Sequence, residues 1–186
     1  DNSQYSYKET HIHGKGGIKV IPKAFVRCGP GSKFRTEFEL LQGRVGLLDI
    51  DYEGHCDENS TMEITSKING KNDDQIMINE TAYLNGKNSR GALISKIAVS
   101  ENAKAHVKNK LVASGEHSIG HVDCKEVIRD QAIASAFPEV EVRHPKARVT
   151  HEASIGTVDN KQLETLMSRG LDEEAATDLI ISGLLS

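Results

Sequence analysis

The chain has 186 residues, with 23 basic and 27 acidic side chains, for a formal net charge of −4 at pH 7. This length accommodates one domain of good size with a small appendage, and no apolar run approaches the roughly 18 residues that a membrane span needs. Basic residues are scattered and only 4% of residues are aromatic, which argues against a nucleic-acid-binding surface, because such surfaces combine a basic stripe with stacking rings.

The cysteines exclude two further kinds of site. Cys28, Cys56 and Cys124 lie far apart and form no Cys-x-x-Cys pair, so neither a zinc knuckle nor a redox dithiol is indicated. Cys28 and Cys56 are interpreted as buried small hydrophobic residues. The odd number of cysteines, with no signal-peptide pattern at the start of the chain, predicts a reducing, cytoplasmic compartment.

Residues 1–16 are polar and contain several glycines and histidines, and we expect them to form an irregular N-terminal segment. His11 and His13 would lie on one face of a strand, a metal-binding geometry seen in cupin-like barrels. The glycines that follow them favour a disordered or tag-like end instead.

Residues 17–158 are predicted to form a parallel β-solenoid. Short apolar or alternating runs recur with Asn, Asp, Gly and Lys between them, a pattern typical of strands and turns. Seven of these runs open at nearly equal steps along the chain, at Ser60, Gln75, Ser89, Ala103, Ser118, Ala132 and Ala147. Two steps together give a constant interval, from Ser60 to Ser89 and from Ser89 to Ser118, which suits one coil with two strands. An antiparallel sandwich is the alternative.

Residues 159–186 are predicted to form a hairpin of two helices. Asp159 or Asn160 can cap a first helix that runs to about Arg169, and Gly170 follows its end. Asp172 can cap the second. The apolar positions are Leu163, Leu166 and Met167 in the first helix and Ala175, Ala176, Leu179, Ile180 and Leu184 in the second. So short a hairpin is not stable alone, so it must pack on the sheet or on another protein.

Two groups of residues are candidates for chemistry. His117, His121, Cys124, His151 and Glu152 offer thiolate and imidazole ligands, which suit borderline metals and iron–sulfur clusters, although their spacing forms no closed metal motif. Glu139 and Glu141 alternate onto one strand face. They would supply the carboxylates of a carbohydrate- or acyl-active β-helix enzyme, although surface charge is the simpler interpretation.

The C-terminal stretch resembles the SufB/SufD family, the scaffold proteins of the SUF iron–sulfur cluster assembly system. The matching residues are Pro138, Glu139, Glu141, Ala147, His151, Glu152, Ala153, Gly156, Leu163, Arg169, Gly170, Ala175, Ile180 and Gly183. The match covers residues 100–186 well, and the earlier residues fit only as generic strand repeats. The chain looks like a short archaeal-type member or the C-terminal half of one, since family members are usually much longer.

The resemblance implies a right-handed parallel β-helix with a helical C-terminal hairpin, and a non-enzymatic scaffold function. In the family, two scaffold subunits pair through the β-helix, as a homodimer or a heterodimer, and a transient iron–sulfur cluster is thought to form near their interface. The helical C-terminal region docks a SufC-type ABC ATPase, whose ATP-driven closure would expose buried ligands. The resemblance implies neither a nucleic-acid partner nor a membrane partner.

Several residues carry over from the family. His151 and Glu152 match the family's His-Glu pair, a proposed cluster-ligand position. The residues that match the ATPase dock are Leu163, Leu166, Met167, Arg169, Gly170, Leu179 and Ile180.

The cysteine position departs from the family pattern. In SufB the cluster cysteine precedes the proline that Pro138 matches, and counting back by the same distance leads here to Asp123, with Cys124 next to it. A shift of one residue in a strand turns a side chain to the opposite face, unless a bulge restores the register. We favour Cys124 as the ligand, because thiolate binds iron better, with Asp123 as the alternative.

Overall fold

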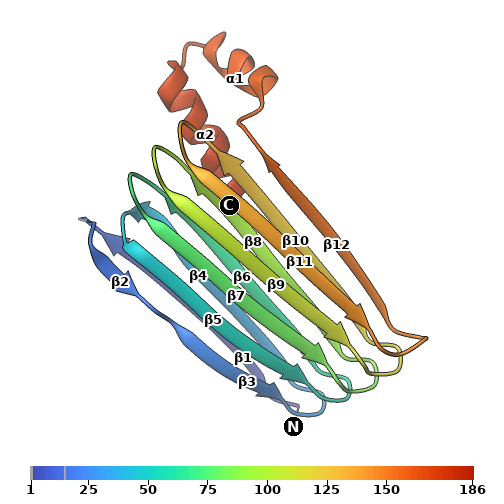
Figure 1. The fold of residues 1–186 in the computed structure, drawn as a ribbon. Coiled ribbons are helices and arrows are strands. Elements are labelled where there is room, and N and C mark those ends of the chain that lie inside the picture. The colour runs from blue at the N-terminus through green and yellow to red at the C-terminus, as the bar shows by residue number, and fades with distance from the viewer. Residues whose placement is uncertain (1, 15) are drawn as a thin grey trace.

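The computed structural model describes residues 2–14 and 16–186, which contain twelve strands and two helices (Figure 1). The strands are β1 (Gln4–His13), β2 (Ile18–Val20), β3 (Lys23–Cys28), β4 (Lys33–Gly43), β5 (Gly46–Cys56), β6 (Thr61–Gly70), β7 (Gln75–Leu84), β8 (Arg90–Val99), β9 (Lys104–Ala113), β10 (Ile119–Ile128), β11 (Ile133–Val142) and β12 (Arg148–Gly156). The helices are α1 (Asn160–Met167) and α2 (Glu173–Leu185).

The strands form two parallel sheets that face each other across one core. Sheet A has the order β1-β4-β6-β8-β10-β12, and sheet B has the order β11-β9-β7-β5-β2, with β3 also paired to β5. In sheet A, Arg90 pairs with Ile119 and Ile119 with Arg148, so equivalent residues of successive coils recur at the constant interval predicted for a coil of two strands. The predicted β-solenoid with a C-terminal helical hairpin is confirmed.

Small buried side chains mark the corners between strands, as the repeat predicted. The hydroxyls of Ser60, Ser89 and Ser118 each donate to the carbonyl oxygen three residues earlier, at 2.7–2.8 Å. Asp74, not the predicted Gln75, occupies the equivalent corner. Asp74 is buried and accepts hydrogen bonds from the backbone N–H groups of Lys71 and Gly46, both at 3.1 Å.

The expectation of an irregular segment over residues 1–16 is wrong for β1. Gln4 to Thr10 pair in register with Lys33 to Glu39 of β4, and the rings of Tyr5 and Phe34 stack at 6.0 Å. Two further strands, β2 and β3, separate β1 from this partner along the chain, so the local composition gave no sign of the pairing. His11 and His13 therefore lie on a strand, with His11 Nδ1 3.2 Å from His13 Nε2.

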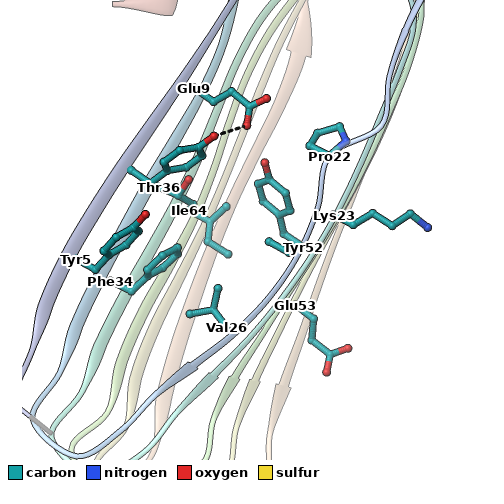
Figure 2. A pocket seen from close by; sticks show the side chains of 12 residues that line it. Tyr5, Glu9, Pro22, Lys23, Val26, Phe34, Thr36, Tyr52, Glu53 and Ile64 are labelled. Carbon is teal, nitrogen blue, oxygen red and sulfur yellow. Dashed lines mark hydrogen bonds between the residues drawn. The ribbon is translucent and has the colours of Figure 1, made fainter.

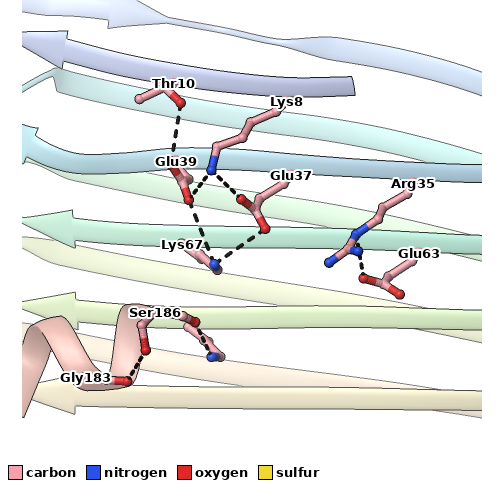
Figure 3. A network of polar contacts seen from close by, with 10 residues as sticks. Lys8, Thr10, Arg35, Glu37, Glu39, Glu63, Lys67, Gly183 and Ser186 are labelled. Atoms are coloured by element: carbon pink, nitrogen blue, oxygen red, sulfur yellow. Dashed lines mark hydrogen bonds and ion pairs between the residues drawn. The ribbon is translucent and has the colours of Figure 1, made fainter. Parts of the chain in front are cut away.

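Ion pairs on the outer face of sheet A join β1, β4 and β6 (Figure 3). Lys8 Nζ lies 2.7 Å from Glu37 and 2.8 Å from Glu39, and Lys67 Nζ lies 3.4 Å from Glu37. The hydrogen bond from Lys8 is the largest cause that lowers the pKa of Glu37, to about 2. These contacts tie the edge strand β1 to its sheet.

Both helices begin at the predicted caps, and α1 ends at Met167, two residues before the predicted Arg169. Asp159 Oδ1 accepts from Gln162 N and Asp172 Oδ1 accepts from Ala175 N, both at 2.8 Å, and Gly170 has φ +98°. The buried face of α2 differs in part from the predicted one: Ala176 is buried as predicted, but Leu179 is exposed. The apolar side chains of Leu179–Ile181 and Leu184–Leu185 are distributed almost all round the helix, so the sequence pattern does not select one face for burial. Ile181 and Leu185 are the ones buried, against Ala98 and Leu41 of sheet A.

One stability prediction follows from the corners. A Cβ atom on Gly115 would lie 1.9 Å from the carbonyl oxygen of Gly86 in the preceding coil, so Gly115→Ala must push two coils apart. We expect a loss of about 2–3 kcal/mol and a thermal midpoint lower by roughly 4–12 °C. Gly156→Ala is the control, because among the described residues no atom beyond its two chain neighbours lies within 4 Å of its Cβ position. Equal midpoints for both variants, measured by circular dichroism, would contradict the stacked corner.

Candidate functional site

Cys124 and Asp123 lie on opposite faces of β10, in the last full coil of the solenoid. Cys124 pairs with Ser95 of β8 and Ala153 of β12 and has no exposed surface. Asp123 pairs with Glu152 on the outer face. The shift of one residue in the sequence therefore does reverse the side chain, and no bulge in β10 restores the register.

The thiol of Cys124 lies inside the solenoid among polar groups. Its Sγ atom is 3.6 Å from the side-chain amide of Asn109 in β9. Burial is the main cause that raises the pKa of Cys124, to about 12, and the neighbouring charge of Glu126 adds to it. The resting side chain is therefore a protonated, shielded thiol and not a reactive thiolate.

His151 and Glu152 lie on β12, the edge strand of sheet A, and both are exposed. His151 pairs with Val122, a buried inward residue, whereas Glu152 pairs with Asp123. Because side chains alternate along a strand, His151 shares the inner face with Cys124, and Glu152 shares the outer face with Asp123. The structure therefore places Cys124 with His151 on the inner face and Asp123 with Glu152 on the outer face. It does not bring Cys124, His151 and Glu152 onto one face.

The outer pair carries an unsatisfied oxygen. Asp123 Oδ2 accepts from Lys125 Nζ at 2.9 Å, and this contact raises the pKa of Lys125. Asp123 Oδ1 is buried and has no hydrogen-bond partner in the described part of the chain. The outer face therefore offers two carboxylates and one ammonium group.

The remaining histidines of the predicted group lie elsewhere. His117 is an exposed corner residue with φ +58°, and the Nδ1 atom of His121 contacts Thr150 Oγ1 at 2.9 Å on the outer face of sheet A. Within residues 2–14 and 16–186, no three or more His, Cys, Asp or Glu side chains are placed to hold a metal ion together.

Glu139 and Glu141 behave as surface charges. Glu139 pairs with Lys110, and Glu141 accepts from Arg143 Nε at 2.8 Å. These hydrogen bonds are the main cause that lowers the pKa of both carboxyls. An acid catalyst needs a raised pKa, so the pair does not favour the glycosidase-like alternative.

Sequence reasoning missed two buried carboxyl groups, Glu80 and Glu126, and the buried amide of Asn109. Ser66 Oγ donates to Glu80 Oε1 at 2.5 Å inside the solenoid, and both oxygens of Glu126 lack a partner among the described residues. The signal was the alternation of β10, where Val122, Cys124 and Glu126 all occupy inward positions. Cysteine and glutamate stand out there, because the other inward residues of β10 are Gly120, Val122 and Ile128.

Glu80 predicts a dependence of stability on pH. Burial raises its pKa from 4.5 to about 7. Below pH 4.5 the carboxyl is protonated in both the folded and the unfolded state; from there to pH 7 only the unfolded state loses the proton, so stability falls by about 3 kcal/mol. We expect Glu80→Gln to match the parent chain at pH 4.5 and to exceed it by about that amount at pH 8 in urea unfolding. Glu58→Gln, in an exposed corner, is the control; an equal gain at both pH values would contradict the prediction.

The predicted docking residues surround the exposed side of the helical hairpin. Met167 is 41% exposed and Leu179 is 52% exposed. Arg169 and Gly170 are exposed, whereas Leu163, Leu166 and Ile180 are half-buried. Leu166 and Ile180 also line a shallow pocket of about 500 Å³ between α1 and α2. Figure 1 shows this hairpin at the end of the solenoid, where α2 contacts β8.

A separate pocket of about 440 Å³ lies in the first coil, between β1 and β4 on one side and β3 and β5 on the other. Figure 2 shows Tyr5, Phe34 and Tyr52 around it, with Lys23 and Glu53 directed away. β1 and β12 are the two edges of sheet A, so this pocket is remote from Cys124. No helix in the described residues is long and apolar enough to cross a membrane.

Comparisons with known proteins point to one family. A family model described as "SUF system FeS cluster assembly, SufBD core domain" matches residues 3–184. An iron-sulfur cluster assembly SufBD family protein of Methanocaldococcus jannaschii is 40% identical over 185 residues, which cover 99% of this chain and 58% of that protein. A Pyrococcus horikoshii protein with the same family name is 37% identical over 185 residues, or 100% of this chain and 56% of that protein. The chain thus spans little more than half the length of these relatives.

Proposed function

The chain belongs to the SufBD family of iron–sulfur cluster assembly proteins, and we propose from this that it acts as a non-catalytic scaffold subunit. It would hold a nascent cluster at a subunit interface and dock a SufC-type ABC ATPase. The cluster is cargo that the scaffold builds and passes on. The observation that carries the proposal is the family match, which spans both the solenoid and the helical hairpin.

The edge strand β12 is the natural place for a shared site. Its residues from Thr150 to Gly156 are exposed, and its outer edge has no strand beside it in sheet A as described. An unpaired strand edge is a ready site for association. A second SufBD subunit, identical or related, would therefore pack against this end and cover His151 and Glu152.

Two ligand sets fit this interface. The first is Cys124 with His151, on the inner face, and Glu152 would join it after the edge strand moves. The second is Asp123 with Glu152, on the outer face. Thiolate is the stronger ligand for iron–sulfur clusters, so we favour Cys124. Mixed sulfur, nitrogen and oxygen ligation would leave the cluster labile, as transfer to another protein requires.

Because Cys124 is buried, the proposed role of the ATPase is to move the strands that shield it. The resting thiol is shielded inside the solenoid, so a rearrangement of the edge strand would bring it to the interface, where it can share a cluster with His151 and Glu152. The helical hairpin packs against Ala98 and Leu41 of sheet A, which connects a partner docked on α1 and α2 to the strands that surround Cys124. Closure of an ATPase pair would pull on this connection.

The experiment that tests the proposal is anaerobic reconstitution with ferrous iron, sulfide and a reductant. We expect a visible absorption band and equal amounts of bound iron and sulfide after desalting. The same chain unfolded in urea is the control for non-specific iron sulfide. A folded chain that retains iron without sulfide, or neither, would contradict the scaffold function.

A further inference from the structure

Glu126 is a buried carboxyl group with nothing to satisfy it. Its side chain is 2% exposed, and neither oxygen has a hydrogen-bond partner in the described part of the chain. In sheet A its neighbours in register are Ile97 and Ile155, which offer only hydrocarbon. An ionised carboxylate in such surroundings is strongly unfavourable without a counter-charge, so an ionised Glu126 needs a cation beside it.

Cys124 lies two residues before Glu126 on the same inward face of β10, which places their Cα atoms roughly 6.6 Å apart. Both side chains point into the interior of the solenoid, and both are buried. The inner face of β10 therefore carries one thiol and one carboxyl group, and neither oxygen of the carboxyl has a hydrogen-bond partner among the described residues.

Asn109 adds a third group from the opposite sheet. In one orientation of its amide, both the oxygen and the nitrogen make hydrogen bonds: Oδ1 accepts from Ser95 Oγ at 2.7 Å, and Nδ2 donates to Glu80 Oε2 at 3.3 Å. The amide atom that faces Ser95 also lies 3.6 Å from Cys124 Sγ, and in this orientation it is the oxygen. An amide oxygen thus points at the thiol.

We propose that Cys124, Glu126 and the amide oxygen of Asn109 form an interior binding site for one divalent first-row transition-metal ion. Thiolate with carboxylate and amide oxygen suits ions of borderline softness such as ferrous iron, cobalt or zinc. One thiolate and one carboxylate carry two negative charges, so a divalent ion leaves the three ligands and the ion together without net charge. A buried site without net charge avoids the main cost of burying ions.

The binding step exchanges protons for the metal. The S–H bond of Cys124 breaks as the metal–sulfur bond forms, and the proton passes to solvent; a proton on Glu126 leaves in the same way. No oxidation state changes. The ion enters past β12, because Ala153, the neighbour of Cys124 on that strand, is exposed and one edge strand separates the site from solvent.

The interior metal site and the proposed cluster site share Cys124, but they hold different cargo and use different further ligands. It concerns a single ion bound without sulfide, inside the last full coil, by residues other than His151 and Glu152. A metal ion held there would stand next to the interface at which a cluster is proposed to form.

The test is anaerobic titration of the full chain with cobalt(II), without sulfide, followed by absorption spectroscopy. We expect one cobalt ion per chain and a thiolate-to-cobalt charge-transfer band. Cys124→Ala should lose that band. Glu126→Gln should keep it at saturation but bind cobalt at least about tenfold more weakly, and this variant is expected to fold because it removes only an unpaired charge. Glu141→Gln, which alters an exposed carboxyl, should bind cobalt like the parent chain.

Two results would overturn the site: no thiolate band in the parent chain, or equal cobalt affinity in Glu126→Gln and the parent. The scaffold proposal fails separately, since it rests on retained sulfide. A chain that assembles a cluster but shows no cobalt band loses only the interior site. A chain that binds cobalt through Cys124 but never retains sulfide loses only the scaffold function.

Discussion

His151→Ala is expected to remove most of the iron and sulfide that the reconstituted chain retains, because it deletes an exposed imidazole from the edge strand where the cluster is proposed to form. Loss of a direct ligand should weaken retention at least about tenfold. The measurements are iron and sulfide per chain and the visible absorption band. His121→Ala is the matched control, since His121 is also on sheet A but faces Thr150 on the outer face.

The same assay separates the two ligand sets. If the inner set holds the cluster, Cys124→Ala loses the band and Asp123→Ala retains it; if the outer set does, the pattern reverses. The band should disappear in one of the two. An unchanged band in both Cys124→Ala and His151→Ala would contradict the inner set that we favour.

The exposed apolar side chains of the hairpin predict an equally large effect on partner binding. Glutamate at both Met167 and Leu179 is expected to abolish co-purification with a SufC-type ATPase, since apolar anchors at an interface centre contribute about 2 kcal/mol or more each, a factor of about 30 in affinity. Both side chains are substantially exposed, so the fold should tolerate the change.

Phe25→Glu is the matched control for this effect. Phe25 is 67% exposed and lies on β3 in sheet B, far along the chain from the hairpin. It should leave ATPase binding intact and show the same circular dichroism spectrum as the hairpin variant. Retained binding in the Met167→Glu/Leu179→Glu variant would show that the partner docks elsewhere.

The solenoid was predictable because its signal repeats. The buried corner serines recur at fixed steps, and each coil imposes the same spacing on the next. The error at Asp74 arose because the side chain buried at that corner is polar. Asp74 can be buried because its carboxylate accepts hydrogen bonds from backbone N–H groups. β1 was missed because its strand character depends on pairing with β4, a contact that no local pattern in residues 4–13 reveals.

The candidate site was predictable only in part. Alternation along a strand correctly separated Cys124 from Asp123, and the same alternation puts Glu126 on the inner face with Cys124. The orientation of Asn109 and the missing partners of Glu126 depend on contacts between the two sheets. Such contacts follow from how the coils stack, and the sequence of one strand does not contain them.

Cluster transfer tests the scaffold function most directly. The reconstituted chain, freed of unbound iron and sulfide, is mixed anaerobically with an apo-ferredoxin in the presence of an iron chelator. A scaffold is expected to convert the apo-ferredoxin to its holo form, read from the ferredoxin spectrum after separation, while its own band declines in proportion. A chain that keeps its cluster, or releases iron only to the chelator, would contradict the account.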